Sequence, residues 1–106
     1  MPKVHIRASA RRDLVDHFIY LSESAGPKVA ERFLDGAESS FADLALQPAM
    51  GSPLTLRQPE LDGMRKWRVR GFENFLIFYL LRPDGVSVVR VLYAAQDWWG
   101  LLGLEN

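Results

Sequence analysis

Apolar residues recur at helical spacing through the first half of the chain. Val4–Ile6 alternates with period two and predicts a short strand, and Ser9 is the expected N-cap of a following helix. Gly26-Pro27 predicts the end of that helix and the start of a second one. In the first helix the apolar stripe advances in steps of four, four and three: Ala10, Leu14, Phe18 and Leu21.

The second helix has a matching stripe and is expected to run to Pro48. Its apolar positions are Val29, Phe33, Ala37, Phe41 and Leu44. Because the turn between the helices is short, we expect an antiparallel helical hairpin. Residues 47–63 then hold several Pro and Gly residues, which predict an ordered loop leading to a sheet.

The second half of the chain has the pattern of strands. We expect three, at residues 64–70, 75–81 and 86–92, and the middle one is apolar on both faces, as in a central strand. Pro83-Asp84-Gly85 predicts a hairpin between the last two. Alternation in the first strand places three cations on one face, opposite Arg65, Trp67 and Val69: Lys66, Arg68 and Arg70.

These elements predict a single α+β domain over residues 1–106. The N-terminal strand and the helical hairpin pack on a small antiparallel sheet whose C-terminal part is a three-strand meander. The length of 106 residues fits one hydrophobic core and no second lobe.

Composition narrows the classes of function. Thirteen Lys and Arg balance thirteen Asp and Glu, and the pI is about 6.7. Both values argue against direct binding to nucleic acid, which usually requires a basic domain. The absence of cysteine excludes disulfides, thiolate metal sites and a Cys nucleophile. The start of the chain lacks a signal-peptide pattern, and its longest uncharged apolar run is far shorter than the roughly 20 residues of a membrane span. We therefore expect a cytoplasmic protein with no membrane association.

The zero net charge conceals a segregation of charge along the chain. Residues 1–12 carry four bases, and residues 13–56 carry seven acids against two bases. Residues 57–90 carry seven bases against four acids, and the tail has two acids. Ten of the thirteen bases are Arg, which binds carboxylates and phosphates in a bidentate manner. The basic strands are either an ordinary solvated face or a surface for an acidic partner or nucleic acid.

Few residues have the spacing of a catalytic or metal site. The histidines, His5 and His17, lie away from the polar strand residues, so neither a metal nor a cofactor is expected. Asp13 and His17 are four residues apart and predict an exposed side-chain pair on the first helix. The serines lack the partners that nucleophilic catalysis requires.

Several strings in both halves resemble the RelE/ParE superfamily of small bacterial toxins. Residues 61–69 (LDGMRKWRV) resemble its first meander strand, 74–79 (NFLIFY) its central strand, and 89–97 (VRVLYAAQD) its last strand and exit. The helical half contributes Asp13-Leu14, Ile19-Tyr20, Ala30–Phe33 and Leu44-Ala45. The resemblance extends from about residue 3 to residue 102 and implies the fold derived above.

The resemblance implies one of two activities. RelE-like members cleave ribosome-bound mRNA with an Arg in the central strand and an Arg and a Tyr near the C-terminus. Here residues 75–81 contain no base, and Ala94-Ala95-Gln96 stand where the late cations would be. The nuclease residues that remain available are Lys66, Arg68, Arg90 and Tyr93.

ParE-like members, the branch that this sequence favours, instead poison DNA gyrase without a catalytic site of their own. This branch implies a type II toxin that inhibits growth and forms a hetero-oligomer with a ParD-like antitoxin. A non-toxic binding module on the same scaffold is a third interpretation.

The sequence itself also offers a physical reason to expect that an antitoxin binds. A groove between hairpin and sheet, edged by Arg, suits an amphipathic helix followed by an acidic segment. Val15 and Ile19 are further candidates to line it, and the tail tryptophans could instead complete the core. The expected antitoxin- or target-binding residues are Leu14, Phe18, Arg65, Trp67, Arg68, Arg70, Arg90, Tyr93, Trp98, Trp99 and Leu102.

Overall fold

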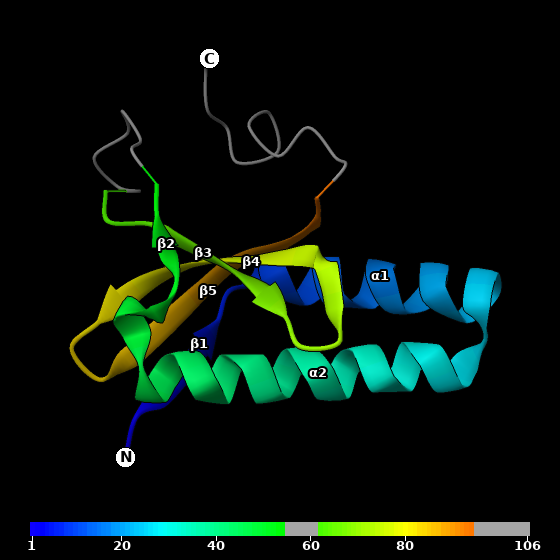
Figure 1. The fold of residues 1–106 in the computed structure, drawn as a ribbon, viewed down its shortest axis with the longest axis horizontal. Coiled ribbons are helices and arrows are strands. Elements are labelled where there is room, and N and C mark those ends of the chain that lie inside the picture. Colours follow the sequence, from blue (N-terminus) through cyan, green and yellow to red (C-terminus); the bar gives the residue numbers. More distant parts are fainter. Residues whose placement is uncertain (55–61, 95–106) are drawn as a thin grey trace.

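Two helices pack against a five-stranded sheet in the computed structural model, which describes residues 1–54 and 62–94 (Figure 1). In those residues, no helix combines the length and the apolar character needed to cross a membrane. The elements are β1 (Lys3–Ile6), α1 (Ala8–Ala25), α2 (Pro27–Leu46), the 3₁₀ helix η1 (Pro48–Met50), β2 (Ser52–Pro53), β3 (Arg65–Val69), β4 (Phe72–Arg82) and β5 (Gly85–Tyr93). The predicted α+β class, helical hairpin and three-strand meander are confirmed, with boundaries shifted by up to three residues.

The sheet differs from the prediction in two respects: it is mixed rather than antiparallel throughout, and the predicted loop over residues 47–63 contains η1 and a fifth strand, β2, which pairs with β3. The strand order is β1-β5-β4-β3-β2, and all neighbours are antiparallel except β1 and β5. β1 pairs in parallel with β5 from Lys3↔Gly85 to Ile6↔Val88. These partners lie about 80 positions apart in sequence, so no local pattern could give their relative direction.

The helical stripes and one face of the sheet form the main core around Phe33. This side chain is fully buried, and its ring centroid lies 4.8 Å from that of Phe75 and 5.5 Å from that of Phe72. Ile77 and Tyr79 of β4 belong to this core, whereas Phe78 belongs to a second cluster with Met64, Val89 and Leu92. Because side chains alternate along a strand, β4 buries apolar residues on both faces, as the sequence predicted.

Beyond the end of β1, the backbone of β5 has no neighbouring strand on that side among the described residues. Polar side chains on α1 form hydrogen bonds with its backbone there. Ser9 Oγ donates to the Val89 carbonyl at 2.8 Å, and His17 Nε2 lies 2.7 Å from the Val91 carbonyl oxygen. The Val91 N–H donates to the Asp13 carboxylate at 2.9 Å. Residues 9, 13 and 17 are spaced by four, so one face of α1 replaces the missing neighbouring strand and protects an exposed edge.

This arrangement corrects two sequence predictions. Ser9 is not the N-cap, because the helix begins at Ala8 and its N-cap Arg7 makes no side-chain capping bond. Asp13 and His17 do not form an exposed pair, because Asp13 is buried and its carboxylate binds Arg90. Sequence spacing showed that the side chains share a helix face but not that β5 lies against it.

The other histidine, His5, joins β1 to the β4–β5 hairpin. Its Nε2 lies 3.0 Å from the Asp84 carboxylate. This hydrogen bond is the main reason why the pKa of Asp84 is lowered from its ordinary value. His5 therefore has a structural contact at one end of the sheet.

Tyr79 anchors η1 and the segment after it to the middle of the sheet. Its hydroxyl donates to the Pro48 carbonyl at 2.7 Å and accepts from the Gly51 N–H at 2.8 Å. Burial raises the pKa of Tyr79 above its ordinary value of 10.0, although the Gly51 N–H and the charge of Arg65 act in the opposite direction. The folded chain therefore favours the neutral phenol.

Replacing Tyr79 by Phe is expected to lower the free energy of unfolding by about 1–3 kcal/mol, because the buried Gly51 N–H loses its acceptor. The parent should also lose stability as the pH rises above about 10. There the unfolded Tyr79 ionises first, which stabilises the unfolded state. Urea denaturation followed by circular dichroism at pH 7 to 11 measures both effects. Equal pH dependence of parent and Y79F would contradict the assignment to Tyr79.

Candidate functional site

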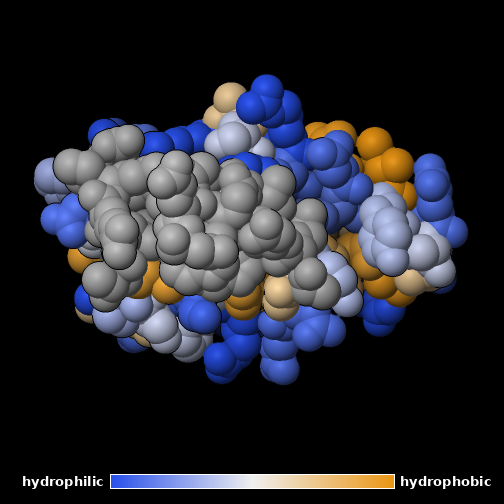
Figure 2. Space-filling model, turned by 90° about the horizontal axis from the view of Figure 1, so that it is seen from above, coloured by the Kyte–Doolittle hydropathy of each residue, from blue (hydrophilic) through white to orange (hydrophobic). Residues whose placement is uncertain are grey.

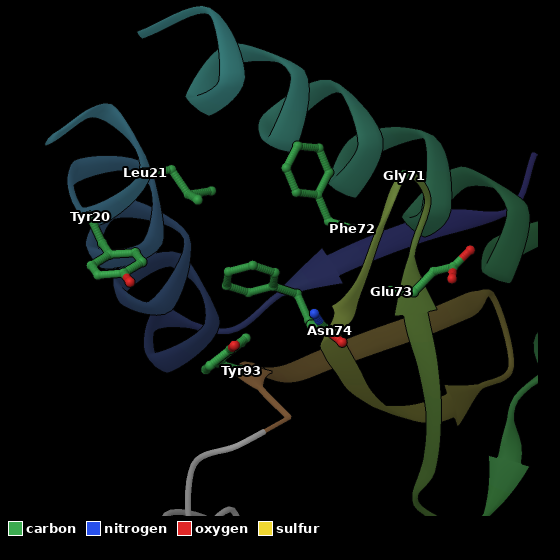
Figure 3. A pocket seen from close by; sticks show the side chains of 8 residues that line it. Tyr20, Leu21, Gly71, Phe72, Glu73, Asn74 and Tyr93 are labelled. Atoms are coloured by element: carbon green, nitrogen blue, oxygen red, sulfur yellow. The ribbon is translucent and has the colours of Figure 1, made fainter. Parts of the chain in front are cut away.

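Two hollows adjoin the turn between β3 and β4, where Gly71 has a φ of +80°. This positive φ favours glycine and lets the chain reverse within two residues. The larger hollow, about 550 Å³, opens between α1 and the start of β4 (Figure 3). It is lined by Tyr20, Leu21, Gly71, Phe72, Glu73, Asn74, Phe75 and Tyr93.

The larger hollow combines four aromatic side chains with the polar side chains of Glu73 and Asn74. Tyr20 is 64% exposed and Tyr93 is 41% exposed, and the ring of Tyr93 lies 5.3 Å from that of Phe75. Figure 3 shows Tyr20 and Leu21 on α1 facing the hollow from one side, with Glu73 pointing away from them. Exposed tyrosines around a concave surface offer a large apolar area with polar tips, which is typical of protein interfaces.

The smaller hollow, about 280 Å³, shares Gly71 and Glu73 with the first and carries charge. The Arg68 guanidinium lies over the Trp67 ring, 4.6 Å from its centroid, an arrangement that gains cation–π attraction. Its lining residues are Ser40, Asp43, Met50, Trp67, Arg68, Arg70, Gly71 and Glu73. We call the two hollows together the β3–β4 turn surface.

Arg70 departs from the predicted row of three cations on one face of β3. The strand ends at Val69, and the Arg70 N–H donates to Ser40 Oγ of α2 at 2.8 Å. The Arg70 side chain forms an ion pair with Asp43, also on α2. The prediction that Lys66, Arg68 and Arg70 share a face is therefore wrong, because the chain turns toward α2 before Arg70.

The structure brings four of the predicted binding residues to the β3–β4 turn surface: Trp67, Arg68, Arg70 and Tyr93. Leu14 and Phe18 are half-buried and pack against the main core. Trp98, Trp99 and Leu102 lie outside the described residues.

Arg65 and Arg90 form contacts within the fold. Arg65 donates to the carbonyls of Ala49 and Gly51 at 3.1 and 2.6 Å. Arg90 binds the Asp13 carboxylate through Nε and a terminal nitrogen at 2.7 and 2.8 Å. These hydrogen bonds raise the pKa of Arg90. Both cations therefore hold elements of the fold together.

Of the eight residues that line the larger hollow, sequence reasoning had named only Tyr93 as a binding residue, and those it missed include Tyr20, Phe72 and Asn74. The signal for Tyr20 is its position off the apolar stripe of α1, where a large aromatic side chain is left exposed. Phe72 and Asn74 precede the predicted central strand, because the structure extends β4 three residues toward the turn.

The four nuclease candidates are divided between two strands: Lys66 and Arg68 lie on β3, and Arg90 and Tyr93 lie on β5. Lys66 and Arg90 both stand opposite Phe78 in register, on the two sides of β4. Strand spacing separates their backbones by about 10 Å, and the Arg90 guanidinium is held by Asp13 on α1. Tyr93 lies three residues further along β5 and contacts Phe75. In the part of the chain that the structure describes, no three His, Cys, Asp or Glu side chains are grouped to hold a metal ion.

The geometry defines a small α+β domain with two hollows beside the turn between β3 and β4. Residues 4–98 match the family model for the ParE toxin of type II toxin-antitoxin systems, parDE. The chain therefore belongs to the ParE toxin family.

A solved structure agrees with this fold. A chain of the chromosomal ParDE toxin-antitoxin system from P. aeruginosa superposes with a TM-score of 0.70 at 15% sequence identity. The match covers 88% of this chain and 96% of that one. Comparison with curated protein sequences gives no significant match.

Proposed function

We propose that this ParE-family toxin arrests growth in the cytoplasm by binding DNA gyrase, and that a ParD-like antitoxin neutralises it by binding. The observation that carries the proposal is that Asp13 holds the Arg90 guanidinium, two strands away from Lys66 and Arg68 on β3, which supports binding over RNA cleavage. Gyrase as the target rests on the resemblance to ParE-like toxins. The competing RelE-like activity needs the same four groups around one phosphate.

The β3–β4 turn surface supports recognition of a protein partner. Its aromatic hollow suits an apolar side chain, and Arg68 over Trp67 suits a carboxylate beside it. Tyr, Trp and Arg are also the residue types that dominate binding energy at interfaces. A segment with apolar and acidic side chains, as in an antitoxin that orders on binding, has the required chemistry.

Supercoiling of relaxed plasmid by purified gyrase tests the target. We expect the chain to inhibit the reaction, and Tyr20→Ala combined with Arg68→Ala to weaken inhibition at least about 10-fold because two interface anchors are lost. Leu81→Ala is the control, since Leu81 is 48% exposed but lies at the end of β4 far from the β3–β4 turn.

Unaffected supercoiling at a stoichiometric excess of folded protein would overturn gyrase as the target. Messenger RNA cleaved during induction in cells, and intact in a Lys66→Ala variant, would establish the nuclease instead. Unchanged growth without the antitoxin would favour the non-toxic binding module.

A further inference from the structure

The solvent-facing side of α1 carries an apolar centre that no described element covers. The described surface in Figure 2 is mostly hydrophilic, with separate hydrophobic patches. Val15 and Ile19 are 57% and 50% exposed, and one helical turn separates them. We call their side of the helix the outer face of α1; its exposed residues are Arg11, Arg12, Val15, Asp16, Ile19 and Glu23.

The outer face points away from the contacts that hold α1 in the fold. At 100° per residue, Val15 and Ile19 lie roughly opposite Asp13 and His17, which bind the edge of β5. Tyr20 lies about 100° around the helix from Ile19 and lines the aromatic hollow. The outer face is therefore distinct from the β3–β4 turn surface.

Charges on the outer face are arranged against the helix dipole. Arg11 and Arg12 lie near the positive N-terminal end of α1, and Glu23 lies in its last turn, near the negative end. None of these three side chains forms an ion pair within residues 1–54 and 62–94. Each would be stabilised by an opposite charge and by an antiparallel neighbouring helix.

We propose that a second copy of this chain packs antiparallel on the outer face of α1 and forms a two-fold symmetric dimer. With the two-fold axis at the level of residue 17, Val15 lies opposite Ile19 of the second copy, and Arg11 lies at the level of Glu23 of the second copy. Arg12 is one residue nearer the axis and lies on the same flank as Glu23. One surface thus supplies both halves of the interface, as two-fold symmetry requires.

The charge pattern selects a second copy over an acidic peptide. Glu23 on the same face would repel carboxylates of such a peptide, whereas the antiparallel arrangement brings the basic end of each helix to the acidic end of the other. The two Asp16 side chains lie near the two-fold axis and repel each other, which keeps the association weak. The two helix dipoles also compensate each other. The helical hairpin extends beyond the strands, so the sheets of two copies can stay apart (Figure 1). Because one helix pair is a small interface, we expect a dissociation constant on the order of 10–100 µM.

Sedimentation equilibrium of the purified full-length chain at about 1 to 300 µM tests the dimer. This concentration range brackets the expected constant. The parent should reach twice its monomer mass, and Ile19→Lys should stay monomeric. Glu23→Arg alone, and Arg11→Glu with Arg12→Glu, should each weaken association about 10-fold by placing like charges together.

The decisive variant combines Arg11→Glu, Arg12→Glu and Glu23→Arg. This variant reverses the sign of the charges at both ends of the outer face, so opposite charges again face each other in the dimer. Its dissociation constant should therefore lie within about 3-fold of that of the parent. Glu31→Arg on an exposed position of α2 is the matched charge control. Circular dichroism confirms that each variant is folded.

A parent that remains monomeric throughout the range, or a charge-inverted variant that fails to recover, would overturn the dimer. Loss of antitoxin binding in Ile19→Lys, with no self-association of the parent, would assign the outer face to the antitoxin instead. Gyrase inhibition does not enter any of these measurements, so the dimer and the proposed function fail separately.

Discussion

Replacing Asp13 by Ala is expected to lower the free energy of unfolding by about 3–5 kcal/mol, one of the largest effects of any single substitution in this fold. The Asp13 carboxylate accepts two hydrogen bonds from Arg90 and one from the Val91 N–H. The side chains of Asp13 and Arg90 are only 9% and 21% exposed. Without Asp13, a largely buried cation and a backbone N–H both lose their acceptor.

Urea denaturation followed by circular dichroism measures this change. Asp16→Ala on the exposed face of the same helix is the control and should change stability by less than about 0.5 kcal/mol. Asp13→Asn keeps an acceptor for the Val91 N–H and removes the charge, so it should have an intermediate effect. Equal stabilities of Asp13→Ala and Asp16→Ala would show that the contact between α1 and β5 is not held by this ion pair.

Replacing Gly85 by Ala is expected to cost roughly 2–6 kcal/mol, from a steric overlap of about 1–3 kcal/mol and a similar backbone strain. Gly85 has a φ of +153°, and a Cβ there would lie 1.9 Å from the backbone oxygen of Lys3. Lys3 is the residue of β1 that pairs with Gly85 in the parallel ladder. The substitution therefore forces β1 away from β5.

Gly63→Ala separates the two contributions. Gly63 also has a positive φ, of +83°, but a Cβ there would meet nothing within 4 Å. Gly63→Ala should therefore lower the free energy of unfolding by backbone strain alone, about 1–3 kcal/mol. Thermal unfolding of both variants provides the comparison, and a Gly85→Ala protein no less stable than Gly63→Ala would contradict the close packing of β1 on β5.

Interactions between the helices and the strands explain why the candidate site was only partly predictable. Arg90 was expected to bind a partner because it belongs to the Arg-rich strands, and Asp13 of α1 binds it instead. Arg70 was expected to align with Lys66, but β3 ends at Val69 and Arg70 forms an ion pair with Asp43 on α2. Trp67, Arg68 and Tyr93 do reach the β3–β4 turn surface, because all three lie near the ends of strands that border it.

The sequence by itself determined the elements and the class of fold. Apolar stripes at steps of three and four specify α1 and α2, and a segment apolar on both faces specifies β4 as a central strand. These patterns are local because each reflects the repeat of one element.

Only the tertiary structure decided which elements meet. The parallel pairing of β1 with β5, the binding of Asp13 to Arg90 and the aromatic hollow between α1 and β4 all join residues more than fifty positions apart. Such contacts depend on how the layers pack and on which backbone groups remain unpaired, and no periodicity within one segment encodes either.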